Sequence, residues 1–194
     1  MENRWMLPAV VCLLLFAGCA TVQHKPTAPW SAIPYEVDTD VRAGIKDLYS
    51  SSPGRRAQGA MSLAKMGTRA APAVPFLTDL LGDTSVPSLV VGPSTGEPVT
   101  VGGAAAVALA AIGAPAVPAL IAATKSASSY GRANAAFALG KIGDRQAVGP
   151  LIELLKDADP AVRGWAVTSL VAITGRNFGF SYDEWKKWYD TESR

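Results

Sequence analysis

The sequence predicts an all-α fold, a solenoid of about four stacked helical hairpins preceded by a half repeat. A twelve-residue pattern is written four times, as RAQGAMSLAKMG, GGAAAVALAAIG, RANAAFALGKIG and RGWAVTSLVAIT. The copies end at Gly67, Gly113, Gly143 and Thr174. A period of about thirty residues or more is typical of stacked repeats and not of a single globular core. Among the 194 residues, 49% are hydrophobic and 18% charged, which is enough to bury a core.

Each copy of the pattern predicts the first helix of a hairpin. In the first copy, apolar side chains recur along one helical face, and a glycine follows where a left-handed C-terminal cap would lie. A second helix is predicted by AVPFLTDLL from Ala73, AVPALIAAT from Ala116 and AVGPLIELL from Ala147. Pro75, Pro118 and Pro150 fall in its first turn, where proline removes no helical hydrogen bond. Each unit is therefore expected to be a helical hairpin.

The two ends of the array have their own signals. Asp38 or Thr39 can cap a half-repeat helix on which Val41, Ile45 and Leu48 recur at helical spacing. At the other end, Ser181-Tyr182-Asp183-Glu184 has the capping-box pattern, so a helix is expected to start there. The aromatic residues that follow fall on one face. The segment 177–190 is therefore expected to close the last repeat as an aromatic cap.

The succession of helix, glycine turn, AVP-type start and second helix is followed by a D-x-x-V-R element, read at residues 159–163. Over about residues 40 to 175, this succession resembles HEAT repeats, specifically the type found in phycobilisome lyases. The resemblance implies an α-solenoid. It also implies a bilin or tetrapyrrole lyase as one alternative function, since the lyases of this type act on phycobiliproteins.

The first residues of the chain have the composition of an export signal. A polar start is followed by an apolar run from Leu7 to Ala17, which is too short to span a bilayer as a mature helix. Residues 1–18 are expected to be a signal peptide, because residues 15–19 resemble the lipobox of bacterial lipoproteins. Cys19 would then carry acyl chains that hold the protein in a membrane, with the outer membrane facing the periplasm favoured. The alternative is a soluble periplasmic or secreted protein.

The domain boundaries follow from these signals. Residues 19–37 are expected to be the lipidated cysteine and a flexible, proline-containing tether. Residues 38–194 form the repeat domain, with an insertion at 84–101 after the first hairpin. Two β-rich runs around a Gly/Pro turn predict a small β-hairpin at 88–101, unless this segment is a passive surface loop.

Candidate partner-binding residues come from the insertion and from the cap. Residues 98–124 carry no charge, which suggests exposed apolar surface on the second repeat beside the insertion. The candidates are Leu89, Val90, Val91, Val99, Val101 and Trp188.

Arginine recurs at one position in three of the four first helices, as Arg56, Arg132 and Arg163. A cation at a helix start opposes the helix dipole, so each arginine is expected to have an acidic partner. Asp157 and Asp159, just before Arg163, are the nearest candidates. A column of structural ion pairs is the favoured interpretation, and an anion-binding column is the alternative.

The residue types exclude several classes of function. His24 is the single histidine, so no Ser/His/Asp arrangement or histidine metal site is expected in the repeats. We expect no catalytic residues, no metal and no cofactor. The charges are scattered and the net charge is only +2, which is unlike a nucleic-acid-binding protein.

The main expectation is a membrane-anchored, non-enzymatic scaffold that binds a protein partner in the cell envelope. One alternative is a bilin or tetrapyrrole lyase-like enzyme. The other is a structural envelope protein that contacts peptidoglycan through Trp185, Trp188 and the Lys186-Lys187 pair.

Overall fold

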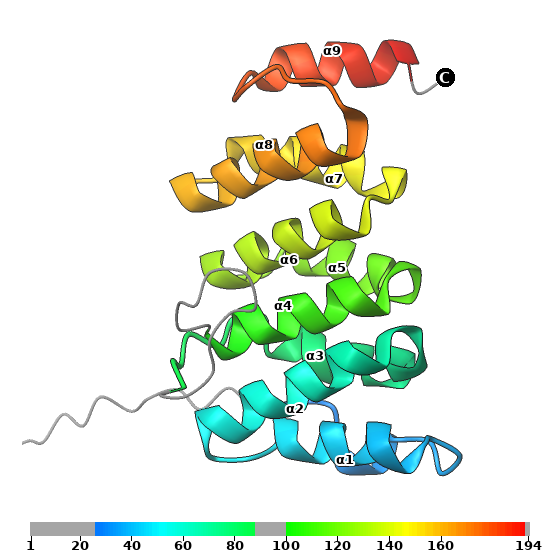
Figure 1. Ribbon diagram of the computed structural model, residues 1–194. Coiled ribbons are helices and arrows are strands. Elements are labelled where there is room, and N and C mark those ends of the chain that lie inside the picture. Colours follow the sequence, from blue (N-terminus) through cyan, green and yellow to red (C-terminus); the bar gives the residue numbers. More distant parts are fainter. Residues whose placement is uncertain (1–25, 88–99, 193–194) are drawn as a thin grey trace, which may run out of the picture.

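The computed structural model describes residues 26–87 and 100–192, and within them the predicted all-α solenoid is confirmed. The first helices of the hairpins lie side by side in one row (Figure 1). They are α2 (Pro53–Met66), α4 (Val101–Ile112), α6 (Ser129–Ile142) and α8 (Pro160–Thr174). The shorter second helices form the row behind them, as α3 (Val74–Asp79), α5 (Val117–Ala123) and α7 (Val148–Glu153). The half-repeat helix α1 (Thr39–Leu48) and the cap helix α9 (Tyr182–Glu192) close the two ends.

Local sequence signals place the ends of these helices. Asp38 caps α1 by accepting a hydrogen bond from the backbone N–H of Asp40 at 2.9 Å. Gly113 and Gly143 follow α4 and α6 with φ of 80° and 79°, values that a side chain would disfavour. In the fourth copy, the capping glycine comes one residue later than the repeat alignment suggests. It is Gly175, with φ of 70°. Short 3-10 turns (Gly67–Ala73, Ala114–Ala116 and Arg145–Ala147) then lead into the second helices.

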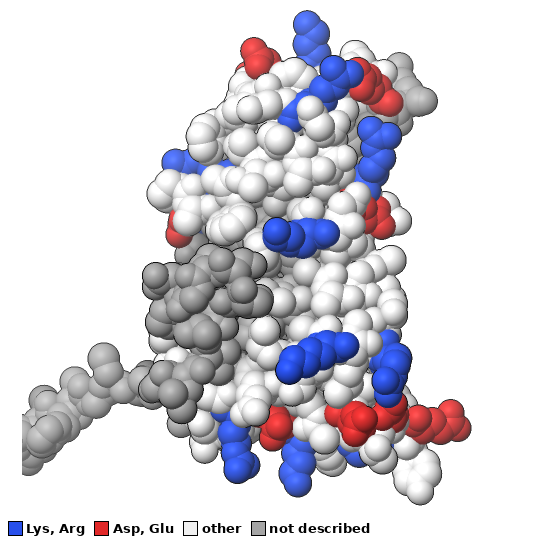
Figure 2. Space-filling view, in the orientation of Figure 1, with Lys and Arg blue, Asp and Glu red and all other residues white. Residues whose placement is uncertain are grey.

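Charged side chains avoid the middle of the row of first helices. Figure 2 shows this face as mostly uncharged, with isolated basic side chains on it and acidic side chains around its margins. Over residues 26–87 and 100–192, no helix combines the length and the apolarity that crossing a bilayer would require.

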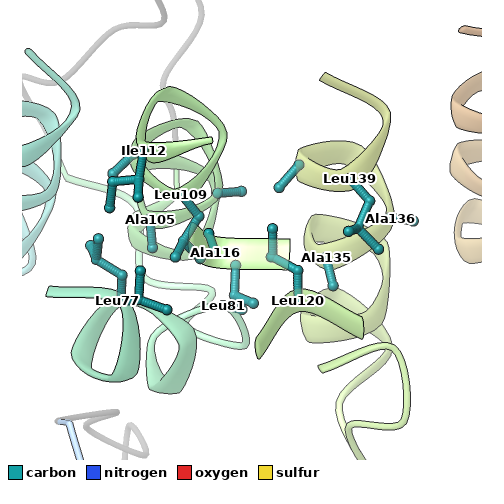
Figure 3. Close-up of a cluster of buried hydrophobic side chains, with 14 of the residues drawn as sticks. Leu77, Leu81, Ala105, Leu109, Ile112, Ala116, Leu120, Ala135, Ala136 and Leu139 are labelled. Atoms are coloured by element: carbon teal, nitrogen blue, oxygen red, sulfur yellow. The ribbon is translucent and has the colours of Figure 1, made fainter. Parts of the chain in front are cut away.

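Small side chains set the distance between neighbouring hairpins. Leucines of α3, α4, α5 and α6 point toward one another, with alanines between them (Figure 3). Ala105, Ala135 and Ala136 are completely buried at these contacts. Larger side chains would force the helices apart, as Gly140 shows, because a Cβ there would lie 2.3 Å from Ser169 Oγ.

Helix α4 lacks charge because most of it is enclosed, so the apolar surface expected on this repeat is limited to a few positions on α4. Eight of its twelve residues are buried between α2, α6 and the second helices. Of the other four residues, Gly103, Val107 and Ala110 are partly exposed and Ala111 is exposed. An inner repeat covered on both sides needs little polar surface.

Residues 26–37, expected to belong to a hydrated tether, instead lie against the first hairpin. Thr27 donates from its N–H and its hydroxyl to Asp79 Oδ2 at 2.8 and 2.7 Å. The Tyr49 hydroxyl donates to the carbonyl of Ala28, and Ile33 is 6% exposed. This segment covers apolar surface that α1 and α3 would otherwise present at the end of the stack. Residues 19–25 lie outside the described residues.

A buried arginine holds the loop after α3 to the start of α2. Arg56 is 1% exposed, and its Nε donates to Asp83 Oδ2 at 2.9 Å. Its Nη1 donates to the carbonyls of Ser50 and Ser51 at 2.9 and 3.1 Å. Its Nη2 lies 2.9 Å from Asp83 Oδ2 and 3.3 Å from Ser85 Oγ. The guanidinium thus makes four hydrogen bonds and a salt bridge, which compensate its buried charge.

The same arrangement recurs two hairpins later. Arg132 Nε and Nη2 donate to the two oxygens of Asp157 at 2.6 and 2.8 Å, a bidentate pair. Its Nη1 donates to the carbonyls of Ser126 and Ala127. In both pairs the acid follows the second helix of the same hairpin, far from the arginine in sequence. We call these two pairs, Arg56–Asp83 and Arg132–Asp157, the arginine ladder.

The second repeat replaces the ladder pair with a different contact. Gly102 and Ser126 stand where the other repeats have arginine and aspartate. Asn134, from the next repeat, reaches across and donates to the carbonyl of Leu81 at 2.8 Å. A Cβ at Gly102 would lie 2.5 Å from that carbonyl oxygen and 2.9 Å from Asn134 Nδ2. The absence of a side chain at residue 102 therefore makes this contact possible.

Replacing Arg56 with leucine is expected to lower the free energy of unfolding by about 3–5 kcal/mol, because Asp83 would stay buried without a cation. Urea unfolding followed by circular dichroism measures the change. Arg69→Leu is the control, since Arg69 pairs with Asp38 at the surface with side chains 64% and 38% exposed. Equal losses for the two variants would contradict the special role of the buried pair.

The ionisation of Asp157 is expected to make the free energy of unfolding depend on pH. The side-chain hydrogen bond from Arg132, above all, holds the pKa of Asp157 below its usual value. A carboxyl group with a lowered folded-state pKa stabilises the fold above its unfolded pKa of about 4, and this stabilisation is lost as the pH falls through the folded pKa. Asp157→Asn is therefore expected to be less stable than the wild type at pH 7. Unfolding measured from pH 7 to pH 2 should show the difference shrink in acid, and a constant difference would refute the assignment.

Candidate functional site

A pocket lies between the N-terminal ends of α6 and α8. Its volume is about 290 Å3, and it is lined by Ser129, Tyr130, Ala133, Asp159 and Ala161. The two helices pack directly against each other, and the small side chains of Ala133 and Ala161 leave the surface hollow between them. Tyr130 stands at this site with 60% of its surface exposed.

Two aromatic rings lie next to the pocket on the same helices. Phe137 follows Ala133 by four residues on α6, and Trp165 follows Ala161 by four on α8, so each lies one turn farther along. Their ring centroids are 5.1 Å apart with planes at 78°, an edge-to-face contact. Trp165 keeps 41% of its surface exposed. We call the pocket and these residues, together with Lys141, the α6–α8 groove.

The groove has opposite charges toward its two ends. Asp159 caps α8, with Oδ1 accepting from the N–H of Ala161 at 2.8 Å. This backbone hydrogen bond is the main reason that the pKa of Asp159 is lowered, so the carboxylate stays ionised at neutral pH. At the other end, Lys141 Nζ lies 5.7 Å from the centroid of the Phe137 ring.

This arrangement suits binding of a flat, conjugated molecule. Exposed aromatic rings offer stacking surface, Asp159 accepts hydrogen bonds, and Lys141 attracts a carboxylate. Over residues 26–87 and 100–192, no three histidine, cysteine or acidic side chains are grouped to hold a metal ion. Cys12 and Cys19 are the chain's two cysteines, so the groove has no thiol of its own.

The structure places few of the sequence-predicted partner-binding residues on its surface. Val101 is completely buried as the first residue of α4, so it is not available to a partner. The prediction that named it wrongly treated it as the end of a surface hairpin. Leu89, Val90, Val91 and Val99, with most of the predicted β-hairpin, lie outside the described residues. Cys19 and the signal peptide lie outside them too.

Trp188 is half-buried in the aromatic cap. It lines a second pocket of about 430 Å3 together with Phe178, Glu184, Lys187 and Thr191. The cap itself centres on Trp185, which is completely buried and donates from Nε1 to the carbonyl of Gly179 at 2.9 Å. Its ring packs edge-to-face on those of Phe178 and Trp188. These contacts account for most of the aromatic residues by packing.

The residues predicted to form an ion-pair column are distributed differently from the expectation. Asp157 pairs with Arg132 and not with Arg163, and Asp159 serves as the cap of α8. Asp83, the partner of Arg56, was not foreseen, because it lies 27 residues away in sequence. Among the residues that the structure describes, Arg163 forms no salt bridge with either acid and bonds instead to the backbone carbonyls of Asp157 and Ala158.

The groove was not predicted from the sequence, although the sequence contains one signal for it. Trp165 occupies a position where the other copies of the pattern have Gln58, Ala104 and Asn134. A large aromatic residue at a position otherwise held by small or polar residues, on a helix face that the repeat does not bury, marks a candidate contact site.

Known structures similar to this chain include a chain from the complex of CpcE and CpcF of phycocyanin lyase from Nostoc sp. PCC7120. The two are 26% identical with a TM-score of 0.49, and the match covers 73% of this chain and 57% of the other. An engineered protein is 24% identical with a TM-score of 0.40, over 70% of this chain and 63% of the other. This chain thus spans less than two thirds of either structure's length. No curated protein matches it.

Two family models match the repeats. The model of HEAT repeats matches residues 117–177, which include the whole groove, and the model of the PBS lyase HEAT-like repeat matches residues 101–126. The second match corrects the expectation of a membrane-anchored, non-enzymatic scaffold, because it favours the lyase-like alternative. The expectation that the protein is not an enzyme is corrected on the same ground. The chain contains HEAT-like repeats, and residues 101–126 are of the type found in phycobilisome lyases.

Proposed function

We propose that this protein has a lyase-type function, in which it binds a linear tetrapyrrole in the α6–α8 groove and presents it to an acceptor protein. The observation that carries the proposal is the match of residues 101–126 to the PBS lyase HEAT-like repeat. These residues form α4 and α5, which both pack against α6, the helix that makes one wall of the groove.

The chemistry of the groove supports a tetrapyrrole as the ligand. A linear tetrapyrrole is a conjugated chain of rings with pyrrole N–H donors and carboxylate side chains. Trp165 and Tyr130 offer stacking surface to such rings. The ionised Asp159 accepts hydrogen bonds from N–H groups, and Lys141 provides a cation for a carboxylate.

The role of the chain in a transfer reaction would be to hold and orient. With no cysteine in the groove, the nucleophile that attacks the tetrapyrrole would come from the acceptor protein. Stacked helical repeats bind proteins along extended surfaces, and the row of first helices, which includes α6 and α8, has a mostly uncharged middle (Figure 2). An acceptor docked there would face the bound tetrapyrrole.

We also propose that acylated Cys19 places this function in the cell envelope. The support is the apolar run of residues 7–17 followed by the lipobox-like residues 15–19. Several acyl chains on one cysteine exceed the single chain that gives only reversible attachment. A tetrapyrrole would then be handled at the membrane surface.

Tetrapyrrole binding can be measured with biliverdin and the full-length protein in detergent, by absorbance and by quenching of tryptophan fluorescence. Trp165→Ala is expected to weaken binding about tenfold, because loss of an aromatic contact costs about 1.4 kcal/mol. Trp30→Ala is the matched control, since Trp30 is 43% exposed and packs on Tyr49 at the end of α1, away from α6 and α8. The proposal fails if the wild type does not bind biliverdin, or if both variants bind it equally well.

Lipidation can be followed by labelling cells with radioactive palmitate and separating membranes from soluble protein. Cys19→Ala is expected to abolish the label and to move the protein out of the membrane fraction, because no acyl chain would remain. Cys12→Ala serves as the control, because Cys12 would be removed with the signal peptide. Unchanged labelling of Cys19→Ala would exclude this anchor and leave the tetrapyrrole proposal untouched.

A further inference from the structure

Three arginines at the same repeat position are held in the same way. In each case Nη1 donates to the carbonyls of the residues six and five positions earlier. These carbonyls belong to Ser50 and Ser51 for Arg56, to Ser126 and Ala127 for Arg132, and to Asp157 and Ala158 for Arg163. The two bonds of Arg163 measure 2.7 and 3.0 Å. The guanidinium of Arg163 is therefore fixed by the same two backbone bonds as those of the ladder.

The three arginines differ in what binds the edge of the guanidinium that is formed by Nε and Nη2. Arg56 and Arg132 use Nε and Nη2 to bind Asp83 and Asp157. Within the described ranges, 26–87 and 100–192, Arg163 makes no salt bridge with a carboxylate. This edge of Arg163 thus has the ladder's geometry without the ladder's acid.

The nearby acids have other roles. Both oxygens of Asp157 accept from Arg132, and Oδ1 also accepts from the N–H of Asp159 at 2.9 Å. Asp159 accepts from the N–H of Ala161 as the cap of α8. Neither can turn to Arg163 without losing these bonds.

The order of helices explains why the last repeat lacks an acid for Arg163. In the ladder, the aspartate lies 27 or 25 residues after its arginine, just beyond the second helix of the hairpin. After α8 the chain turns at Gly175 and enters the aromatic cap, in which the next helix is α9, packed on α7. At the corresponding distance the chain has Asp190, which pairs with Lys186 on α9.

We propose that Arg163 binds an acidic side chain from a loop of a partner protein, in the geometry of the Arg132–Asp157 pair. Both ladder acids are presented by a tight turn, in which the carboxylate also accepts from the N–H two residues later, at 2.9 Å in each case. The edge formed by Nε and Nη2 fits a planar carboxylate with two parallel bonds. Arg163 is only half-buried, so a partner can reach it. This inference does not depend on the tetrapyrrole proposal.

The ladder supplies a probe for this site. Residues 80–86, LLGDTSV, form the loop that presents Asp83 to Arg56. A blocked peptide of this sequence is titrated into the full-length, nitrogen-15-labelled protein, and the Nε–Hε signals of the arginines are followed by NMR. The Arg163 signal is expected to move and to saturate, while those of Arg56 and Arg132 stay in place because their edges are occupied.

The matched peptide with asparagine in place of the aspartate is expected to bind at least about tenfold more weakly, since a bond to a charged group contributes about 1.5–3 kcal/mol. Acetate and inorganic phosphate are titrated as free anions at equal ionic strength. The proposal is overturned if the Arg163 signal does not move. It is equally overturned if the asparagine peptide, acetate or phosphate binds as well as the aspartate peptide.

Variants provide a second test. Arg163→Lys keeps the charge and removes the two-bond edge, so the aspartate peptide is expected to bind it about tenfold more weakly. Arg176→Lys is the control, because Arg176 is an exposed arginine whose Nη2 lies 3.6 Å from Glu192. Equal binding to both variants would refute the role of Arg163. Should Arg163→Lys fail to fold, the titrations of the wild-type protein still decide the question.

Discussion

Burial of each hairpin's apolar stripe against its neighbours is the constraint on which the rest of this structure depends. A single hairpin here has two short helices and cannot cover its own leucines, so stability comes from stacking. Alanine and glycine at the contacts let the first helices approach closely. The α6–α8 groove also results from small side chains at a helix contact, because Ala133 and Ala161 are too small to fill the space between adjacent helices.

Polar contacts add a second level to this packing by fixing where loops lie. Apolar surfaces tolerate sliding, whereas Arg56, which bonds to four residues, is satisfied in one position of the loops around it. A buried arginine left without its acid is costly, so misplacement of the loop after α3 is penalised. At the second repeat, Asn134 of the third hairpin bonds across Gly102 to the carbonyl of Leu81, which follows α3 in the first hairpin.

The fold could be predicted from the sequence because its determinants are local and repeated. Glycines after α4 and α6, prolines in the first turns of α3 and α5, and Asp38 before α1 each act within a few residues. The polar partners could not be assigned in this way. Asp83 and Asp157 reach arginines that are 25 or more residues away, and only the stacking geometry brings them together. The position of residues 26–37 could not be predicted for a related reason. Their proline-rich composition favours an extended chain, whereas their contacts with Tyr49 and Asp79 are tertiary.

Function was harder to predict than fold, because alanines and leucines at repeat positions specify stacking and say little about the ligand. The two residues that distinguish this array from a plain stack of repeats both lie on α8. They are Arg163 and Trp165, two residues apart. An α-helix turns by about 100° per residue, so two residues separate their directions by about 200°. Trp165 therefore contacts Phe137 in the groove, while Arg163 reaches back to the loop before α8. Because the two sites use different sides of one helix, a tetrapyrrole in the groove and an acidic loop on Arg163 can be bound at the same time. Occupation of one site would thus leave the other site free.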